Sequence, residues 1–280
     1  MVLAAGLGTR LRPLSDALPK PLVPIGDRPA LLHVLERLRA GGVTRAVMNT
    51  FHLPDAFARL EGVPLRLEVV REATLLGTAG GVANAALQLG DGAVLVWNAD
   101  ILADLDVGAL LAAHDRAGGA ATLAVAPRPV GEGTVGLGAG AEVVRLRGER
   151  FGDEVQGGDF LGVHVLGAGL RPQLPAVGCL VGDVYLPLLR AGGRLQAHAT
   201  HAAWDDVGSV ASYLAANVRW LRGRGAASFV GAGAEVASGI QLQDSVIGAG
   251  ARVEGEGTLR RVVVWPGARA RAPLSDSVVT

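Results

Sequence analysis

Short runs of β-branched and aliphatic residues alternate with helical patterns through the first 225 residues. We expect buried strands at Val2–Ala5, Arg45–Thr50, Leu65–Val70, Ala93–Trp97 and Ala121–Ala126. Helical patterns lie at Pro29–Ala40, Thr78–Leu89, Asp106–Ala117, Val184–Arg190 and Gly208–Arg222. This alternation predicts an α/β fold with a mostly parallel sheet and helices on both faces. Ligands of such sheets bind at the carboxyl ends of the strands.

The pattern changes near Ala226. From there apolar residues recur about every six positions, with small residues between them: Val230, Val236, Leu242, Ile247, Val253, Leu259 and Trp265. A hexapeptide period is typical of a left-handed parallel β-helix, and the alternative is an ordinary β-hairpin tail. The chain is therefore predicted to contain two domains, residues 1–225 and 226–280, joined near Arg222–Gly225.

Composition narrows the class of protein. The 280 residues are half hydrophobic, which is too apolar for disorder, yet no apolar run reaches the ~18 residues of a membrane span. Because 26 basic residues balance 26 acidic ones, we expect no nucleic-acid or membrane partner. The single cysteine, Cys179, excludes an intrachain disulfide and a cysteine-clustered zinc site. With no signal-peptide pattern, we expect a cytoplasmic protein whose true start lies a few residues upstream.

A glycine-rich loop follows the first strand, within LAAGLGTRLRPLSDALPKPLVPIG, residues 3–26. Gly6 and Gly8 lack Cβ atoms, so backbone N–H groups there can approach a phosphate closely. Arg10 can donate two hydrogen bonds to phosphate oxygens, and Lys20, the only lysine, supplies a compact charge between two prolines. The alternative is that this single lysine in an arginine-rich chain has no function and is present by chance. After the first strand, Gly6-Leu7-Gly8 is followed by Thr9-Arg10-Leu11, so the third glycine of a G-x-G-x-x-G dinucleotide motif is missing there, and no G-x-x-x-x-G-K-[ST] motif is present.

From Gly6 to Pro21 the chain resembles the sugar-1-phosphate nucleotidyltransferases, or NDP-sugar pyrophosphorylases. Their signature is roughly G-x-G-T-R-L-x-P-L-[TS]-x-x-x-P-K-P, and every element stands here, with Ser15 in the hydroxyl position. The resemblance implies a Rossmann-like core and catalytic roles for Arg10 and Lys20. The hexapeptide tail resembles that of mannose-1-phosphate guanylyltransferase-like members. Nucleotide contacts are implied for Leu3, Ala5, Gly6, Gly8 and Thr9.

A second segment, Leu76–Gly81, resembles the L-G-T-A-G sequence of the family and implies nucleotide contacts from Gly77 and Thr78. A strand-to-helix junction of small residues favours an anion or a polar base edge. Glu72 lies where the family places a base-contacting side chain. Its carboxylate suits the N1–H and N2 amine of guanine, which favours GTP, although the N3–H of uracil or thymine is also a donor.

Two aspartates are predicted to bind Mg²⁺. Asp100 ends an apolar strand in N-A-D, which is similar to the N-G-D of the family. Asp206 lies in W-D-D-V-G-S, which is similar to W-x-D-x-G-T, and in this register Asp205 is not a ligand. Mg²⁺ uses one or two protein carboxylates together with phosphate oxygens and water. The alternative for each aspartate is a helix cap.

The sugar side departs from the family. Members usually carry an E-K-P motif whose lysine holds the sugar phosphate, and here no second lysine exists. We expect Arg150 to replace it and Glu149 to face the sugar; the alternative is a solvated charged turn. Asp159 or His164, in a segment similar to the sugar-side strand of the family, would meet sugar hydroxyls, although a lone strand histidine is more often structural.

These residues predict the reaction of an NTP with a sugar 1-phosphate to give an NDP-sugar and pyrophosphate, with Mg²⁺ as cofactor. GTP with mannose 1-phosphate is the expected pair, and glucose 1-phosphate with UTP or dTTP is the alternative. The missing E-K-P lysine leaves open a non-catalytic sugar-nucleotide-binding regulatory subunit. A β-helix acyltransferase is disfavoured because no histidine follows His201, and an NAD dehydrogenase because the third glycine is absent. We expect a homo-oligomer formed through the β-helix.

Overall fold

The computed structural model describes all residues from Met1 to Thr280, and they divide into two compact units. Unit 1 consists of Met1–Gly6 and Val34–Trp204, and unit 2 consists of Leu7–His33 and Asp205–Thr280. Each unit therefore combines two stretches that are distant in the sequence. The predicted boundary at residues 225 and 226 falls inside unit 2, and as a functional division it stays a prediction.

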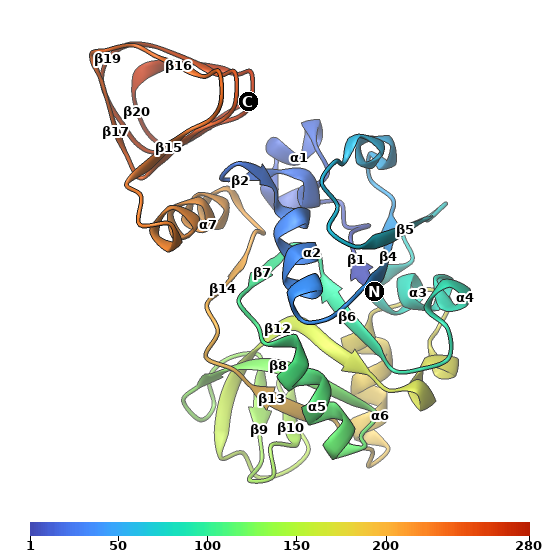
Figure 1. Cartoon of the computed structure of the whole chain (residues 1–280). Coiled ribbons are helices and arrows are strands. Elements are labelled where there is room, and N and C mark those ends of the chain that lie inside the picture. The colour runs from blue at the N-terminus through green and yellow to red at the C-terminus, as the bar shows by residue number, and fades with distance from the viewer. The chain divides into compact units, whose positions relative to one another are not determined.

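Unit 1 is built on a ten-stranded sheet. Its parallel core is formed, in spatial order, by β5, β4, β1 and β6, at Arg66–Arg71, Arg45–Thr50, Val2–Leu3 and Val94–Asn98 (Figure 1). The long strand β12 (Gln156–Leu166) continues the sheet beyond β6 and is antiparallel to it. β12 also pairs with β8 (Ala121–Arg128), and β8 pairs in turn with β13 (Gln196–Ala199). Through its N-terminal part β12 pairs with β9 (Val135–Leu137), which is followed by β10 (Val143–Leu146) and β11 (Glu149–Arg150).

The α/β prediction is confirmed, and all five predicted strands are present with ends that differ by at most two residues. The longer helices are α2, α3, α5, α6 and α7, at Ala30–Ala40, Gly77–Asn84, Val107–Ala117, Leu186–Arg190 and Val210–Gly223. Short elements are α1, α4, β2, β3, β7 and β14, at Leu14–Ala17, Ala86–Leu89, Pro24–Ile25, Arg28–Pro29, Ile101–Ala103 and Trp204–Asp206. No helix combines the length and the apolar character that a membrane span requires.

Helix boundaries follow from local side-chain chemistry. Asp106 caps α5, since its Oδ1 accepts the Ala109 N–H at 2.9 Å, and Gly118 ends the helix with φ 58°. Ser209 begins α7 through a capping box with Ser212. The two helices are therefore started by Asp106 and Ser209.

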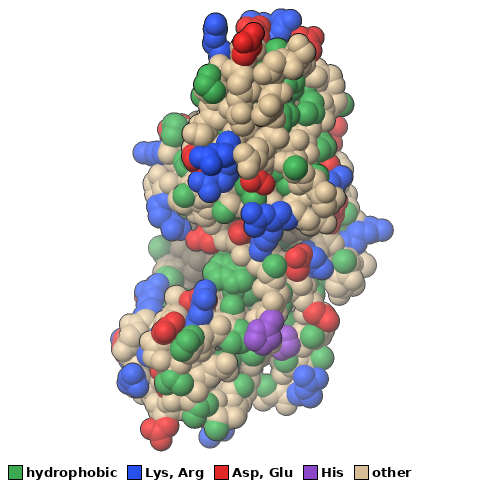
Figure 2. All heavy atoms as spheres, turned by 90° about the vertical axis from the view of Figure 1, so that its left-hand side faces the viewer, with side chains coloured by type: hydrophobic (Ala, Val, Ile, Leu, Met, Phe, Trp, Pro, Cys, Tyr) green, Lys and Arg blue, Asp and Glu red, His purple; other side chains and the backbone are tan.

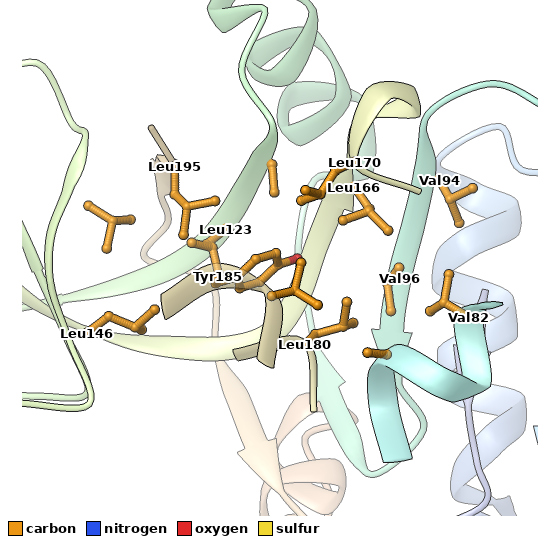
Figure 3. Close-up of a cluster of buried hydrophobic side chains, with 14 of the residues drawn as sticks. Val82, Val94, Val96, Leu123, Leu146, Leu166, Leu170, Leu180, Tyr185 and Leu195 are labelled. Carbon is orange, nitrogen blue, oxygen red and sulfur yellow. The ribbon is translucent and has the colours of Figure 1, made fainter. Parts of the chain in front are cut away.

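The core of unit 1 lies between the sheet and Leu180–Tyr185, the segment that precedes α6. Val94 and Val96 of β6 point toward the same cluster as Leu180 and Tyr185 of that segment (Figure 3). Each such buried side chain contributes roughly 1.5–3 kcal/mol relative to exposure. The segment from Leu180 to Arg190 is therefore fixed against the sheet by apolar burial.

His164 of β12 is a core residue. It is 3% exposed, and neither ring nitrogen has a hydrogen-bond partner. Its ring centroid lies 5.5 Å from that of Phe160 and 5.7 Å from that of Tyr185. Burial lowers the pKa of His164 to about 3. The structural alternative for this histidine therefore holds, and the side chain does not face a solvent-accessible sugar site.

The C-terminal part of unit 2 is a six-stranded sheet of β15–β20, at Ser228–Val230, Glu235–Val236, Ile240–Gln243, Ser245–Ile247, Arg252–Val264 and Arg269–Val279. Every pairing is parallel, and paired residues are 17 positions apart (269 minus 252) in most of the sheet. Figure 1 shows that the sheet is curled, and Val253, Leu259 and Val264 belong to its buried cluster. The hexapeptide β-helix itself stays a prediction.

Helix α7 holds the stretches of unit 2 together. The Tyr213 hydroxyl donates to the Pro24 carbonyl at 2.7 Å and accepts the Trp265 Nε1–H at 3.0 Å. Asn217 Oδ1 accepts the Gly26 N–H at 2.8 Å. One helix thus carries hydrogen bonds to the N-terminal stretch and to the curled sheet.

Charges on the surface are mixed. In the face shown in Figure 2, basic and acidic side chains are interspersed, in keeping with the formal net charge of +0. No large basic area stands out on this face.

We expect the free energy of unfolding to fall as the pH drops from 6.5 toward 3. Unfolded histidine takes up a proton near pH 6.5, whereas folded His164 does so only near pH 3, so protons favour the unfolded chain in this window. The slope contributed by His164 is at most about 1.4 kcal/mol per pH unit. Urea unfolding at several pH values measures it. His164→Phe should flatten the slope and exposed His201→Gln should not; equal slopes in all three proteins would contradict the assignment.

Candidate active site

The glycine-rich loop turns at Gly8, whose φ of 64° lies in the left-handed region. A Cβ at Gly8 would lie 3.0 Å from the Cβ of Ser15 and 3.4 Å from that of Lys20. The Ser15 hydroxyl donates to the Gly8 carbonyl at 2.8 Å, and Ser15 is fully buried. The hydroxyl of the sequence signature therefore closes the turn. Thr9 begins the single 3-10 turn that follows.

Two basic side chains meet the carboxylate of Asp206 within unit 2. Lys20 Nζ lies 3.5 Å from Asp206 Oδ1, and Arg10 Nη2 lies 3.6 Å from Oδ2. The Lys20 side chain is only 10% exposed, whereas those of Arg10 and Asp206 are 71% and 40% exposed. A Cβ at Gly208 would lie 2.8 Å from Asp206 Oδ1 and 3.0 Å from Arg10 Nη2, so glycine leaves room for this cluster.

The capping alternative fails for both predicted metal ligands. Ser209 caps α7, so Asp206 does not. Asp100 lies between β6 and β7, and the next helix is capped by Asp106. Asp100 therefore stands where it was expected, at the carboxyl end of a parallel strand, and Asp205 forms an ion pair with Arg219 at 2.5 Å.

A buried polar cluster lies at the carboxyl ends of β1, β4 and β5 in unit 1. Asn49 Nδ2 donates to Glu72 Oε1 at 2.7 Å, and Asn49 Oδ1 accepts the Ala4 N–H at 2.9 Å. Glu72 Oε2 accepts the Leu76 N–H at 3.1 Å. Asn49 and Glu72 are 2% and 7% exposed. A Cβ at Gly81 would lie 2.5 Å from Asn49 Nδ2, so this glycine leaves space for the amide.

Glu72 therefore already has a partner on each carboxylate oxygen. A carboxylate offers about four lone-pair sites, so each oxygen can still accept one donor from a ligand. Asn49 was not identified from the sequence. Its signal was an amide side chain near the end of an otherwise apolar strand, next to the strand that leads into the glycine-rich loop. Leu3, Ala5 and Gly6 lie at that same end of β1.

Gly77 and Thr78 contact protein backbone in unit 1. Thr78 Oγ1 accepts the Leu180 N–H at 2.8 Å, and the Ala79 N–H donates to the Gly178 carbonyl at 2.9 Å. A Cβ at Gly77 would lie 2.4 Å from the Gly178 oxygen. Close packing of residues 176–180 on the start of α3 explains the glycine at 77, and the nucleotide contacts of Gly77 and Thr78 stay predictions.

The structure does not bring Glu149 and Arg150 to the strand ends described above. They form the outer strand β11, which pairs with β10 alone. Arg190 donates to both Glu149 oxygens at 2.9 and 2.5 Å and lowers the pKa of that carboxyl. Arg150 is exposed. The two residues thus lie on a charged strand at the surface, and their role toward the sugar phosphate stays a prediction.

Asp159 lies on β12 and accepts a hydrogen bond from Arg128 Nε at 2.7 Å. Its side chain is 20% exposed, and that of Arg128 is 51% exposed. The neighbouring Phe160 N–H donates to Thr134 Oγ1 at 2.8 Å. The predicted sugar-side residue Asp159 is thus held next to a cation that the sequence did not single out.

Comparison with known proteins gives a consistent result. Residues 1–138 match the family model described as nucleotidyl transferase. A mannose-1-phosphate guanylyltransferase of Mycobacterium tuberculosis is 39% identical over 118 residues, which is 41% of this chain and 33% of that protein. A mannose-1-phosphate guanyltransferase of Aspergillus fumigatus is 30% identical over 234 residues, covering 79% of this chain and 64% of its own length.

The chain thus spans less than two thirds of the length of these curated relatives. Among solved structures, that of HddC from Yersinia pseudotuberculosis complexed with GMP-PN matches with a TM-score of 0.66 and 23% identity. The match covers 78% of this chain and 97% of that chain. This likeness shows a shared fold.

We expect Gly77→Ala to destabilise the protein more than Gly42→Ala. Both glycines have positive φ, 75° and 87°, but a Cβ at Gly42 would meet nothing within 4 Å, whereas one at Gly77 would overlap the Gly178 carbonyl. The strain of a left-handed alanine is common to both variants, and the overlap should add about 1–3 kcal/mol for Gly77→Ala. Urea unfolding of the two variants measures the difference. Equal losses would show that residues 176–180 do not pack closely on α3.

Proposed function

The chain belongs to the nucleotidyl transferase family of sugar nucleotidyltransferases, and on that premise we propose that it transfers a nucleotidyl group from an NTP to a sugar 1-phosphate. An oxygen of the sugar phosphate forms a bond to the α-phosphorus, and the bond from that phosphorus to the bridging oxygen of the β-phosphate breaks. The products are an NDP-sugar and pyrophosphate. The attacking oxygen is already anionic, so no general base is needed, and catalysis rests on positioning and charge.

The observation that carries this proposal is the meeting of Lys20 and Arg10 at Asp206. Two cations at one point can neutralise charge on phosphates. Lys20, which is nearly buried, would hold the reacting phosphates as a compact charge, and exposed Arg10 would bind the leaving pyrophosphate through its fork of donors. Both side chains would then exchange the Asp206 carboxylate for phosphate oxygens.

We infer that Asp100 and Asp206 would hold Mg²⁺. Asp206 Oδ1 is buried and accepts no hydrogen bond, which suits a metal ligand. No group of three or more histidine, cysteine, aspartate or glutamate side chains is arranged to hold a metal, so the remaining ligands would be phosphate oxygens and water. When bound, Mg²⁺ neutralises phosphate charge and supports in-line alignment.

The proposed substrates are GTP and mannose 1-phosphate. The support is the carboxylate of Glu72, which Asn49 and the Leu76 N–H orient, and the resemblance to mannose-1-phosphate guanylyltransferases. Two adjacent donors of guanine match the two free acceptor sites of that carboxylate. Glucose 1-phosphate with UTP or dTTP is the alternative pair.

We also propose that residues 226–280 form a left-handed parallel β-helix through which the chain self-associates. The 17-residue offset between paired strands is close to three hexapeptides, and the sheet is curled. A solenoid of few coils leaves apolar ends that a second copy can cover. A cytoplasmic location is likewise proposed, from the single free cysteine.

Pyrophosphate release tests the reaction. Four NTPs are assayed against several sugar 1-phosphates, with and without Mg²⁺, and we expect one preferred, Mg²⁺-dependent pair. Lys20→Ala, Asp100→Ala and Asp206→Ala should each lower kcat by roughly 10²–10³. Lys20→Ala removes a cation that would neutralise the phosphates, and each aspartate variant removes a carboxylate that would hold Mg²⁺. Asp205→Asn is the matched control and should retain most of the activity. Nucleotide binding without turnover would favour a regulatory subunit, and near-normal rates in Lys20→Ala would refute its assignment.

Sedimentation velocity tests self-association. The full chain should sediment as a species larger than its 28.5 kDa monomer, and the species should dissociate on dilution as mass action requires. A monomer at every concentration examined would rule out assembly through the curled sheet.

A further inference from the structure

The missing lysine leaves a chemical gap on the sugar side. A sugar 1-phosphate carries a phosphate that needs a cationic or multiply donating partner. Lys20 is the only lysine, and Arg150, the arginine in the string most similar to the expected motif, lies on the outer strand β11, which pairs with β10 alone. A different basic side chain must therefore be found near the carboxyl end of β6.

Arg128 lies at that edge of the sheet. It is the last residue of β8, and both β8 and β6 are antiparallel to β12, so β8 and β6 run in the same direction. The carboxyl end of β8 therefore faces the same edge as the carboxyl end of β6, where Asp100 follows. The two strands are separated by β12 alone, which corresponds to about 10 Å.

Asp159 orients the Arg128 side chain. β12 pairs Val163 with Trp97 near the end of β6, and from there the strand carries Asp159 beyond that end. Asp159 Oδ2 accepts the Nε–H of Arg128 at 2.7 Å. No other hydrogen bond or ion pair involves Arg128, so its Nη1 and Nη2 groups, on a half-exposed side chain, are open to a ligand. A guanidinium held by Nε presents that fork to an anion.

The loop beside this pair is anchored by a buried ion pair. Arg145 donates to both Glu154 oxygens, at 2.8 and 3.0 Å, and their side chains are only 10% and 2% exposed. Arg145 also donates to the carbonyls of Glu132, Gly133 and Val135. The hydrogen bonds lower the pKa of Glu154 to about 2.

These hydrogen bonds fix the position of the loop at residues 132–135, which lies beside Asp159. A Cβ at Gly133 would lie 3.0 Å from Asp159 Oδ1, so the loop backbone lies directly against the orienting carboxylate. An ion pair removed from water is costly unless its hydrogen bonds are complete, and here they hold one loop in one place. The loop backbone at Gly133 is therefore held next to Asp159, the carboxylate that orients Arg128.

We propose that Arg128 binds the phosphate of the sugar 1-phosphate through Nη1 and Nη2, in place of the missing lysine, and that Asp159 is its positioning residue. The inference rests on the proposed function, because the phosphate in question is that of the acceptor substrate. It replaces the assignment of Arg150 and Glu149 to the sugar phosphate.

The test is steady-state kinetics of the full-length chain with the sugar 1-phosphate varied at saturating NTP. Arg128→Ala should raise the KM for the sugar 1-phosphate about 10- to 100-fold, as expected for loss of a charged hydrogen bond, and leave the KM for the NTP within about threefold. Arg128→Lys should recover part of the loss. Asp159→Asn should raise the same KM by less than Arg128→Ala. Arg150→Ala is the matched control and should leave both constants unchanged.

Two results would overturn the inference: an unchanged KM in Arg128→Ala, or a raised KM in Arg150→Ala instead. Should the wild type turn over no pair, the proposed reaction fails, and calorimetric titration with mannose 1-phosphate and glucose 1-phosphate then decides about Arg128. Binding lost in Arg128→Ala and kept in Arg150→Ala supports the site, whereas equal binding, or none by the wild type, refutes it. Arg128→Gln, which keeps most of the side-chain stem, replaces Arg128→Ala if thermal unfolding shows that the latter does not fold.

Discussion

The buried hydroxyl of Tyr213 is the point on which the structure of unit 2 depends. It donates to the Pro24 carbonyl and accepts from the Trp265 indole, so one oxygen joins three stretches of chain. Burial raises the pKa of Tyr213, which keeps the proton in place for the bond to Pro24. Lys20 belongs to the first of these stretches and Asp206 to the second, and the 3.5 Å between them exists only while the stretches are held together.

The sequence was most informative where the chemistry is local. Buried strands are apolar runs in the sequence, and all five strands that were predicted are present. The helix caps Asp106 and Ser209 also act within four residues, but they were not named from the sequence, which offered Asp206 as a cap instead. The strand β12 was not predicted along its length, because Gly157, Gly158 and Gly162 weaken its pattern. The structure gives the reason: a Cβ at Gly162 would lie 2.5 Å from the Asn98 amide, so a contact across the sheet selected glycine.

Side chains that act through a partner on another strand could not be predicted from the sequence. Asn49 and Arg128 matter through Glu72 and Asp159, which are distant in sequence and become neighbours only through strand order. Glu149 and Arg150 were predicted because they are the string most similar to the E-K-P motif of the family, and strand pairing places them on the outer strand β11. Glycine motifs are ambiguous for a related reason. The absence of a Cβ lets either a ligand or another part of the protein backbone come close, and at Gly77 it is the Gly178 carbonyl that does so.

The interleaving of the two units has a consequence for synthesis on the ribosome. Unit 1 needs only residues up to Trp204, whereas Leu7–His33 must wait for the partners that begin at Asp205. The intervening 171 residues (34 to 204) take roughly 10–35 s to translate. During that interval the apolar stretch around Leu22–Ile25, which is buried in the finished protein, has no helix α7 to cover it. The segment that carries Lys20 is thus the part of the nascent chain that a chaperone would have most reason to hold.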